Sequence, residues 1–366
     1  MTRSVLRPYW VARWPVSLAG ALVALQLAAC GDAQPAEQLA VVSAAHRAGL
    51  RFSVQDLGQA YANPYDASLG INDRGMVVGT RGLTPDQRTG FVFEHGKFTE
   101  VGSPELELRA VNARGLAVGG MYSPTQPARA ISYYKGVITD LGTLEGADTS
   151  WSWGVNDRGV AIGDAFVAGV SHAAAFYGGK VFDLGVLGLG SYPNGINDHG
   201  DVVGSWQVDA NTWRGFIVPR GGSIQDFEEA TGVPGVGSVD KISNGGTVCG
   251  SAEMPNGYHG FLWRKGTVTD LGDLGYGWSI CMDVSDSGMA VATAAVDPYG
   301  DTAACLWRSA KEGMIDLNTL IPAEVAAHVY LWWSSGINSV GQITAWGWDF
   351  AEGTNKAYLL SPVGCW

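Results

Sequence analysis

Short runs of β-branched and aromatic residues, broken by glycine turns, dominate the chain from about residue 51 onward. This pattern is typical of strands, and no long 3.6-residue apolar period predicts a helix there. One turn motif recurs seven times, as an apolar residue, Asn or Ser, two variable residues and Gly. The Asn or Ser stands at positions 72, 112, 156, 197, 243, 285 and 338. The spacing averages about 44 residues, which is typical of β-propeller blades.

Each repeat has room for four strands, which we letter A to D in chain order. Strand A leads into the Asn turn, where the Asx side chain bonds the local backbone and Gly takes a positive φ. Strand B follows the turn, and a variable loop leads to strand C. A short Gly turn such as Lys265-Gly266 joins strands C and D. Strand C carries an aromatic or apolar core in every repeat, as in Phe91-Val92-Phe93, Phe216-Ile217-Val218 and Phe261-Leu262-Trp263.

Strand D is missing from the end of the seventh repeat. The first six repeats each close on an acidic residue followed by an apolar one, at Glu100, Asp140, Asp183, Asp226, Asp270 and Asp316. The seventh runs through Tyr358 to the chain end without such a pair, but a spare copy, Asp56-Leu57-Gly58, precedes the first repeat. The sequence therefore predicts an all-β fold, a seven-bladed β-propeller of four-stranded blades closed by the N-terminal strand. A linear β-solenoid is the alternative, although it would not need the displaced strand.

Small residues stand two positions before the turn Asn or Ser in five repeats, at Gly70, Ala110, Gly154, Gly195 and Gly336. They suit an innermost strand, because seven such strands converge on the axis. Two adjacent repeats carry Lys241 and Asp283 at this position. We expect them to form an ion pair at the channel wall, and a contact with a ligand is the alternative.

The N-terminus has the pattern of a targeting segment. Arg3, Arg7 and Arg13 precede an apolar run over residues 16–29, which is shorter than a membrane-spanning helix requires. Leu27-Ala28-Ala29-Cys30 resembles a bacterial lipobox, which implies that Cys30 is acylated and forms a stable lipid anchor. An ordinary secretory signal with a chance Cys is the alternative.

Three regions follow from this pattern: a lipoprotein signal peptide over 1–29, a lipid anchor and tether over 30–50, and the propeller over 51–366. The expected location is the bacterial cell envelope. Gly31 follows the Cys, so the Asp that would signal inner-membrane retention is absent from that position. If the host is Gram-negative, this favours the outer membrane.

The repeats resemble the HAF-repeat family of bacterial extracellular proteins, in which a His-Ala-Phe-like strand C accompanies Ile-Asn-Asp-x-Gly and Asp-Leu-Gly segments. The triplet reads here as His259-Gly260-Phe261, Ala174-Ala175-Phe176 and Arg214-Gly215-Phe216, and the match covers roughly residues 52–363. The resemblance implies an exported protein with a repeat fold. It implies no defined reaction, so no catalytic residue is assigned.

Composition narrows the classes of function. The 366 residues carry 23 Lys and Arg against 35 Asp and Glu, a formal net charge of −12, which argues against nucleic-acid binding. Apolar residues make up 46% of the chain, which excludes a largely disordered protein. Besides Cys30, an even number of cysteines permits two disulfides with three pairings in an oxidising compartment, and free buried thiols are the alternative. These cysteines are Cys249, Cys281, Cys305 and Cys365.

Aromatic residues concentrate in the D–A and B–C loops and the adjoining strand ends, which a propeller places on one face. The A–B and C–D turns on the opposite face are rich in Gly and charged residues. We predict that the D–A/B–C face binds a glycan or protein ligand, with packing between blades as the alternative for each ring. The candidate contacts are Trp151, Trp153, Trp206, Trp213, Trp278, Trp332, Trp333, Trp346 and Trp348. Tyr122, Tyr276 and Tyr299 lie in the same loops.

Signals for catalysis and for metal or cofactor binding are weak. The six His residues show no paired metal spacing, and Asp297-Pro298-Tyr299-Gly300-Asp301 reads as a turn rather than a calcium loop. We therefore expect no metal and no cofactor. The predicted function is ligand binding by a lipid-anchored envelope protein. The alternatives are a polysaccharide-acting hydrolase or lyase with acids on the same face, and a non-catalytic scaffold of an envelope complex.

Overall fold

The computed structural model describes residues 49–59, 69–82, 88–102, 106–123 and 126–364. The predicted signal peptide, Cys30, nearly all of the tether and Cys365 lie outside the described residues. Among the residues described, no helix is long and apolar enough to cross a membrane.

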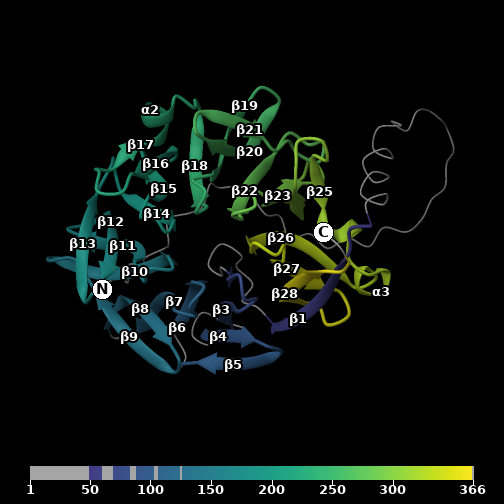
Figure 1. Cartoon of the computed structure of the whole chain (residues 1–366), viewed down its shortest axis with the longest axis horizontal. Coiled ribbons are helices and arrows are strands. Elements are labelled where there is room, and N and C mark those ends of the chain that lie inside the picture. The colour runs from purple at the N-terminus through teal and green to yellow at the C-terminus, as the bar shows by residue number, and fades with distance from the viewer. Residues whose placement is uncertain (1–48, 60–68, 83–87, 103–105, 124–125, 365–366) are drawn as a thin grey trace, which may run out of the picture.

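The strands form seven antiparallel four-stranded sheets arranged as a ring around a central opening (Figure 1). Blade 1 contains β2 (Gly70–Ile71), β3 (Val77–Arg81), β4 (Thr89–Glu94) and β5 (Lys97–Val101). Blade 2 contains β6 (Leu106–Val111), β7 (Ala117–Ser123), β8 (Gln126–Tyr134) and β9 (Val137–Gly142). Blade 3 contains β10 (Ala147–Val155), β11 (Ala161–Val167), β12 (Val170–Tyr177) and β13 (Lys180–Gly185).

The remaining blades repeat this meander. Blade 4 contains β14 (Ser191–Ile196), β15 (Val202–Gln207), β16 (Trp213–Val218) and β17 (Gln225–Asp226). Blade 5 contains β18 (Val236–Ile242), β19 (Val248–Met254), β20 (Gly257–Arg264) and β21 (Thr267–Asp270). Blade 6 contains β22 (Ser279–Val284), β23 (Ala290–Ala295), β24 (Thr302–Trp307) and β25 (Met314–Asp316). Blade 7 contains β26 (Val329–Ile337), β27 (Ile343–Asp349), β28 (Thr354–Pro362) and β1 (Phe52–Gln59).

The N-terminal strand closes the ring as predicted. β1 lies outermost in blade 7 and pairs antiparallel with β28, with Asp56 opposite Tyr358. Lys356 Nζ lies 2.9 Å from Asp56 Oδ2 across the same pair of strands. Because the two ends of the described chain share one sheet, the fold is a closed seven-bladed propeller and not a linear solenoid.

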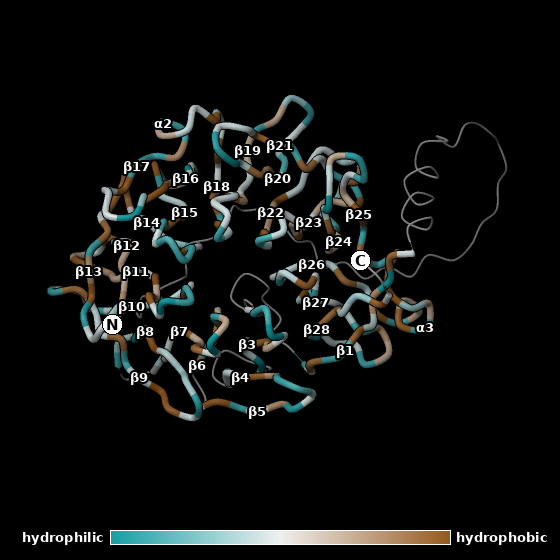
Figure 2. The backbone as a smooth tube through the Cα atoms, viewed as in Figure 1, coloured by the Kyte–Doolittle hydropathy of each residue, from teal (hydrophilic) through white to brown (hydrophobic). Residues whose placement is uncertain are grey.

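The same register recurs between strands C and D in every blade. The acidic residue of strand D lies opposite the core residue of strand C: Phe91 faces Glu100, Phe216 faces Asp226, and the other blades repeat the pairing. One ring of strand C in each of five blades is among the largest fully buried side chains: Phe91, Phe176, Phe216, Phe261 and Tyr358. Figure 2 shows hydrophobic segments within the sheets and mostly hydrophilic turns around the central opening.

In the described part of the D–A connections there are three short helices. They are α2 (Phe227–Thr231), the 3-10 helix η2 (Leu317–Thr319) and α3 (Ala323–Ala326). We expected Asp226-Phe227 to be strand D of blade 4, but the strand ends at Asp226. The Asp226 carboxylate accepts a bond from Glu229 N at 3.0 Å and so caps α2.

One disulfide joins neighbouring blades. Cys249 in β19 is bonded to Cys281 in β22, so strand B of blade 5 is tied to strand A of blade 6. Cys305 is a free, buried thiol in β24. The structure thus selects one of the disulfides that the sequence permitted and shows that Cys305 is a core residue.

Candidate ligand-binding face

Strand A carries a bulge in blades 2 to 7, where the described residues cover the whole strand. The pairing of strands A and B skips one residue of strand A, so that residue is extra, and bulges of this kind redirect side chains. The extra residues are Arg109, Trp153, Asn194, Asp240, Met282 and Ser335. Strand A is the innermost strand of each blade, so the bulges lie on the strands that surround the central opening (Figure 1). These bulges were not predicted from the sequence.

A glycine in strand B accommodates the bulge. A Cβ atom at Gly163 would lie only 1.7 Å from Trp151 O on strand A, and one at Gly119 would lie 1.8 Å from Glu107 O. Both distances are far below van der Waals contact. In blades 2 and 3 the Gly of strand B is therefore required by the close approach of the bulged backbone, whereas blades 6 and 7 carry Ala292 and Ala345 at this position.

A buried polar network includes Trp153, one of the predicted ligand contacts. The Arg109 guanidinium stacks 4.3 Å from the Trp153 ring and lies 2.6 Å from Glu107 Oε2, which Arg88 also contacts through Oε1. Trp153 Nε1 donates to Asp164, and Ser171 Oγ donates to the same carboxylate at 2.8 Å. Burial raises the pKa of Asp164, and the bonds from Trp153 and Ser171 oppose that shift. The polar edge of Trp153 is therefore already engaged inside the protein.

The prediction of an ion pair between Lys241 and Asp283 is wrong. Lys241 Nζ donates to Asn194 O in blade 4 at 3.0 Å, and Ile337 N in blade 7 donates to Asp283 Oδ2 at 3.0 Å. The two side chains reach toward opposite neighbouring blades, and no ion pair joins them in the described structure. Burial raises the pKa of Asp283 to about 6, while the charge of Lys241 opposes that shift.

Two of the nine predicted tryptophan contacts are core residues. Trp346 is 1% exposed and Trp333 is 7% exposed, and both pack in one cluster with Leu57, Leu69 and Phe91. The prediction that they contact a ligand is wrong, because neighbouring strands and the adjacent blade cover both rings.

Six further tryptophans are half-buried on the predicted face. Trp206 Nε1 donates to Asp226 at 3.0 Å, and Trp332 Nε1 donates to Asn355 at 3.2 Å. Trp151 packs against the backbone of Gly120 in the neighbouring blade. Trp213 lies 5.4 Å from the Tyr192 ring, and Trp153 and Trp278 complete the half-buried set. Their partners show a packing role, and ligand contact stays a prediction for each.

Most of the exposed apolar side chains on this face are not tryptophans. Trp348 is 37% exposed, whereas Tyr299 is 92% exposed. The remaining exposed members are Met121, Tyr122, Leu189, Tyr276 and Phe350. Sequence reasoning missed Met121, Leu189 and Phe350, because it weighed the aromatic content of the loops and not which side chains stand at their tips.

The loops that present these side chains are acidic. Arg88 is the one Lys or Arg in the described residues of the D–A and B–C loops. The acids in the same loops are Glu145, Asp209, Glu228, Glu229, Asp273, Asp297, Asp301, Glu324 and Glu352. The backbone N–H of Asn211 is the first of several donors that lower the pKa of Asp209. Desolvation opposes ionisation of Asp297, but the N–H groups of residues 299–301 outweigh it and lower the pKa.

The histidine of the HAF-like triplet links strand C to the following loop. His259 Nδ1 lies 2.9 Å from Asp270 Oδ1, and its Nε2 lies 2.9 Å from Asp273 Oδ2. Arg214 in blade 4 and Lys356 in blade 7 occupy the same triplet position and pair with the acid of strand D in the same way. Within the described residues, no group of three or more His, Cys, Asp or Glu side chains is placed to hold a metal ion.

Comparisons with known proteins support the fold. No protein-family model matches the chain, and no curated protein matches its sequence. The structure of YCF48 bound to D1 peptide is similar, with a TM-score of 0.52 and 10% identity over 86% of this chain and 96% of that one. Puromycin hydrolase has a TM-score of 0.52 and 12% identity over 81% of this chain. A puromycin-hydrolyzing peptidase of Mycobacterium tuberculosis has a TM-score of 0.48 and 10% identity over 86% of this chain.

The chain spans 55% of puromycin hydrolase and 54% of the mycobacterial peptidase, about half the length of each. At these identities the likeness shows a β-propeller fold and nothing finer.

Proposed function

We propose that this chain is a binding module of the bacterial cell envelope, whose D–A/B–C face holds a basic segment of another protein. The observation that carries the proposal is the exposed apolar surface on acidic loops. Tyr299, Phe350 and Leu189 are all more than half exposed there. Large apolar side chains that stand exposed on loops supply the surface that a partner protein can cover.

The kinds of exposed side chain favour a protein over a sugar. Tyr, Trp and Met are enriched in protein interfaces, and this face exposes Tyr299, Trp348 and Met121. Most of its tryptophans use their ring N–H or one ring face within the protein, which leaves few open ring faces for stacking on a sugar. A flexible Met or Leu adapts to an apolar side chain of a partner.

The charge of the loops favours a basic partner. Their carboxylates would attract Lys and Arg side chains and repel anionic glycans, because complementary potentials steer association. Asp209 and Asp297 have lowered pKa values, so these two carboxylates stay ionised well below neutral pH. The related fold of YCF48 was solved with a peptide bound, which supports the capacity of such a ring to hold one.

The location belongs to the same proposal. Acylation at Cys30 would anchor the chain to a membrane of the envelope, the outer membrane if the host is Gram-negative. The resemblance of the repeats to the HAF-repeat family supports export. Labelling of cells with a radioactive fatty acid should mark the wild-type chain and leave Cys30→Ser unmarked, and labelling of both would refute the assignment of Cys30.

Two parallel screens test the ligand class. A phage-displayed random-peptide library should yield binders rich in Lys, Arg and apolar residues, whereas a glycan array should show no binding. The variant Tyr299→Ala/Trp348→Ala should lose peptide binding. The control Tyr177→Ala/Phe182→Ala removes two aromatic side chains that are similarly exposed on outer strands, and it should bind normally.

The alternatives give different results in the same screens. Binding to glycans alone would replace the protein ligand with a sugar, and shortened glycans after incubation would indicate the hydrolase or lyase. A stoichiometric envelope partner that binds equally to both double variants would indicate a scaffold and refute the role of this face.

A further inference from the structure

The opposite face carries the opposite charge along its outer rim. The C–D hairpins and their flanking residues hold only two acids, Glu94 and Glu312, within the described structure. The bases in the same hairpins are Lys97, Lys135, Lys180, Arg220, Arg264, Lys265, Arg308 and Lys311. The molecule therefore has an acidic D–A/B–C face and a basic rim on the A–B/C–D face.

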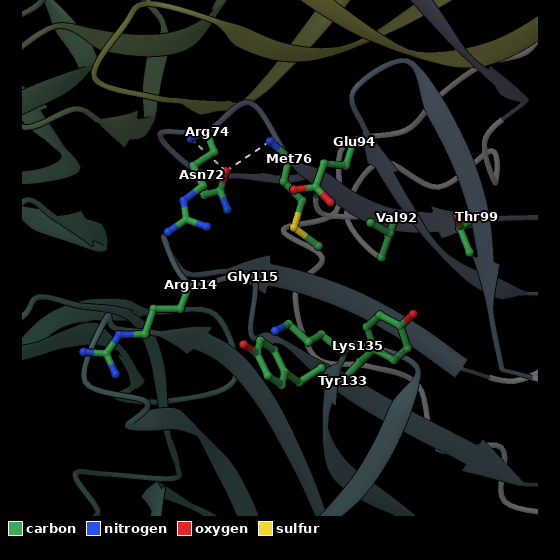
Figure 3. Close-up of a pocket in the computed structure, with 11 residues that line it drawn as sticks. Asn72, Arg74, Met76, Val92, Glu94, Thr99, Arg114, Gly115, Tyr133 and Lys135 are labelled. Atoms are coloured by element: carbon green, nitrogen blue, oxygen red, sulfur yellow. Dashed lines mark hydrogen bonds between the residues drawn. The ribbon is translucent and has the colours of Figure 1, made fainter.

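A cleft of about 270 Å³ between blades 1 and 2 gathers three cations on this face. Arg74 and Arg114 come from A–B turns, and Lys135 comes from a C–D hairpin (Figure 3). Glu94 is the only acid that lines the cleft. Among the described residues, none of the three cations forms an ion pair, and Lys135 Nζ lies over the Tyr134 ring at 5.1 Å. The cations are available to an anion from outside.

The acids of the neighbouring A–B turns are already engaged. Asp157 accepts the backbone N–H of Ala113 at 2.7 Å, and Asp198 accepts that of Asp157 at 2.7 Å. Asp73 accepts the N–H of Ser339 at 2.8 Å. These carboxylates bridge adjacent blades, so backbone donors already stabilise part of their charge.

The first strand of the chain, β1, also begins on the A–B/C–D face. Phe52, the first residue of β1, pairs with Pro362 at the end of strand C. Ser361 beside it accepts a bond from Gln342 Nε2 at 3.0 Å, and Gln342 lies in the A–B turn of blade 7. A tether that runs from Cys30 to Phe52 would therefore leave the propeller from the A–B/C–D face.

We infer that the A–B/C–D face docks on the anionic phospholipid headgroups of the membrane that holds the anchor, so that the ligand-binding face points away from it. This inference rests on the proposed envelope location. A tether of about 20 residues reaches up to roughly 70 Å when extended, so the anchor alone leaves the orientation free. Lys and Arg side chains near an anionic leaflet supply the orienting attraction.

The net negative charge of the chain does not prevent this contact. The Debye length is about 8 Å at physiological ionic strength, whereas a six-residue strand spans roughly 20 Å. The acids of the far face are therefore largely screened from the membrane. The acidic face itself would be repelled, which adds to the preference for one orientation.

Vesicle sedimentation tests the docking without the lipid anchor. The secreted chain carrying Cys30→Ser should sediment with vesicles that contain phosphatidylglycerol, and high salt should release it. Vesicles of phosphatidylcholine alone should not bind it. Adding Arg114→Glu/Lys135→Glu should lower binding by roughly tenfold or more. Adding Arg81→Glu/Arg129→Glu makes the same charge change on the other face and should leave binding unchanged.

Orientation is read from a fluorophore on a single introduced cysteine. Val340 is 57% exposed in an A–B turn, and Tyr299 is exposed on the other face. A dye on Val340→Cys should respond to anionic vesicles, and a dye on Tyr299→Cys should not. Equal responses, or equal losses of binding in both charge-reversal pairs, would overturn the docking. Fatty-acid labelling of Cys30 and peptide binding are measured separately, so failure of the proposed function is recognised independently.

Discussion

Asn338 Nδ2 in blade 7 donates to the backbone carbonyl oxygen of Asn72 in blade 1 at 3.0 Å, although 266 residues separate the two. The same bond links Asn72 to Asn112 O, Asn112 to Asn156 O and Asn156 to Asn197 O. Each of these four Asn residues therefore shapes its own turn through Oδ1 and ties its blade to the next through Nδ2, whereas Asn197 Nδ2 donates to Asp201 within its own turn. The belt runs from blade 7 to blade 4 and crosses the junction of blades 7 and 1 on the inner strands, while β1 completes blade 7 on the outside.

The belt predicts that two substitutions at Asn156 lower the free energy of unfolding by different amounts. Asn156→Ala leaves two backbone N–H groups, Arg158 N and Val160 N, without their acceptor and removes one of two donors to Asn197 O. It should lower the free energy of unfolding by about 2–4 kcal/mol. Asn156→Ser should cost less, because Ser243 holds the equivalent turn through a bond from Thr247 N. Urea denaturation measures both variants, and equal losses would show that the turn bonds contribute nothing.

The closure of the ring by β1 predicts that a substitution at Phe52 also lowers the free energy of unfolding. Its side chain is 1% exposed and packs with Leu320, Leu331 and Leu360 between blades 6 and 7. Phe52→Ala should lower the free energy of unfolding by about 3–5 kcal/mol through a cavity in that core. Ser53→Ala on the same strand alters an exposed side chain and should change stability little. If both variants unfold at the wild-type urea midpoint, β1 does not stabilise the ring.

The disulfide predicts a response to reductant that depends on one pair of cysteines. Cys249 and Cys281 are 32 residues apart, so the bond restricts the unfolded chain by about 3–4 kcal/mol in the loop-entropy view. Dithiothreitol should lower the melting temperature of the wild type. It should have no further effect on Cys249→Ala/Cys281→Ala. Cys305→Ala keeps the disulfide and should respond as the wild type does, and an unresponsive Cys305→Ala would contradict the pairing.

The repeat period and the displaced strand could be predicted because each is recognised from a few consecutive residues. Each Asn turn and each acidic end of strand D needs only its own few residues, and a spare Asp56-Leu57 before the first repeat identifies the missing partner of Tyr358. The inter-blade role of Asn72 could not be predicted from one repeat, because its acceptor lies 40 residues away in the next blade.

The candidate site was harder to predict, since burial depends on neighbouring blades. Trp346 and Trp348 lie two residues apart on β27 and point to the same side of the strand, yet one is 1% exposed and the other 37%. The difference arises from how far the packing of adjacent strands extends toward the end of β27. Lys241 and Asp283 likewise bond to opposite neighbouring blades, which their own repeats do not show.

The half-buried acids of strand A, Asp240 and Asp283, predict an unusual dependence of stability on pH. Burial raises the pKa of Asp240 to about 6 from an ordinary value of 3.8, although Ser238 and Lys241 oppose the shift. The folded state therefore favours the protonated carboxyl, and its ionisation opposes folding at neutral pH. This contribution of Asp240 should make the protein more stable as the pH falls from above 6 toward 4. Asp283 shares the same direction and adds to the effect.

The variant Asp240→Asn isolates that effect, because the amide keeps an acceptor for Ser238 Oγ and carries no charge. It should raise the free energy of unfolding at about pH 7.5 and change it little at about pH 4, where the wild-type carboxyl is already neutral. Asp209→Asn is the control of opposite sign, since backbone N–H groups lower the pKa of Asp209 and its charge favours folding. It should lose stability at about pH 7.5. Urea midpoints at the two pH values measure both variants. Equal effects of Asp240→Asn at the two pH values would show that this carboxyl does not titrate between them. The burial of Asp240 would then not account for the dependence of stability on pH.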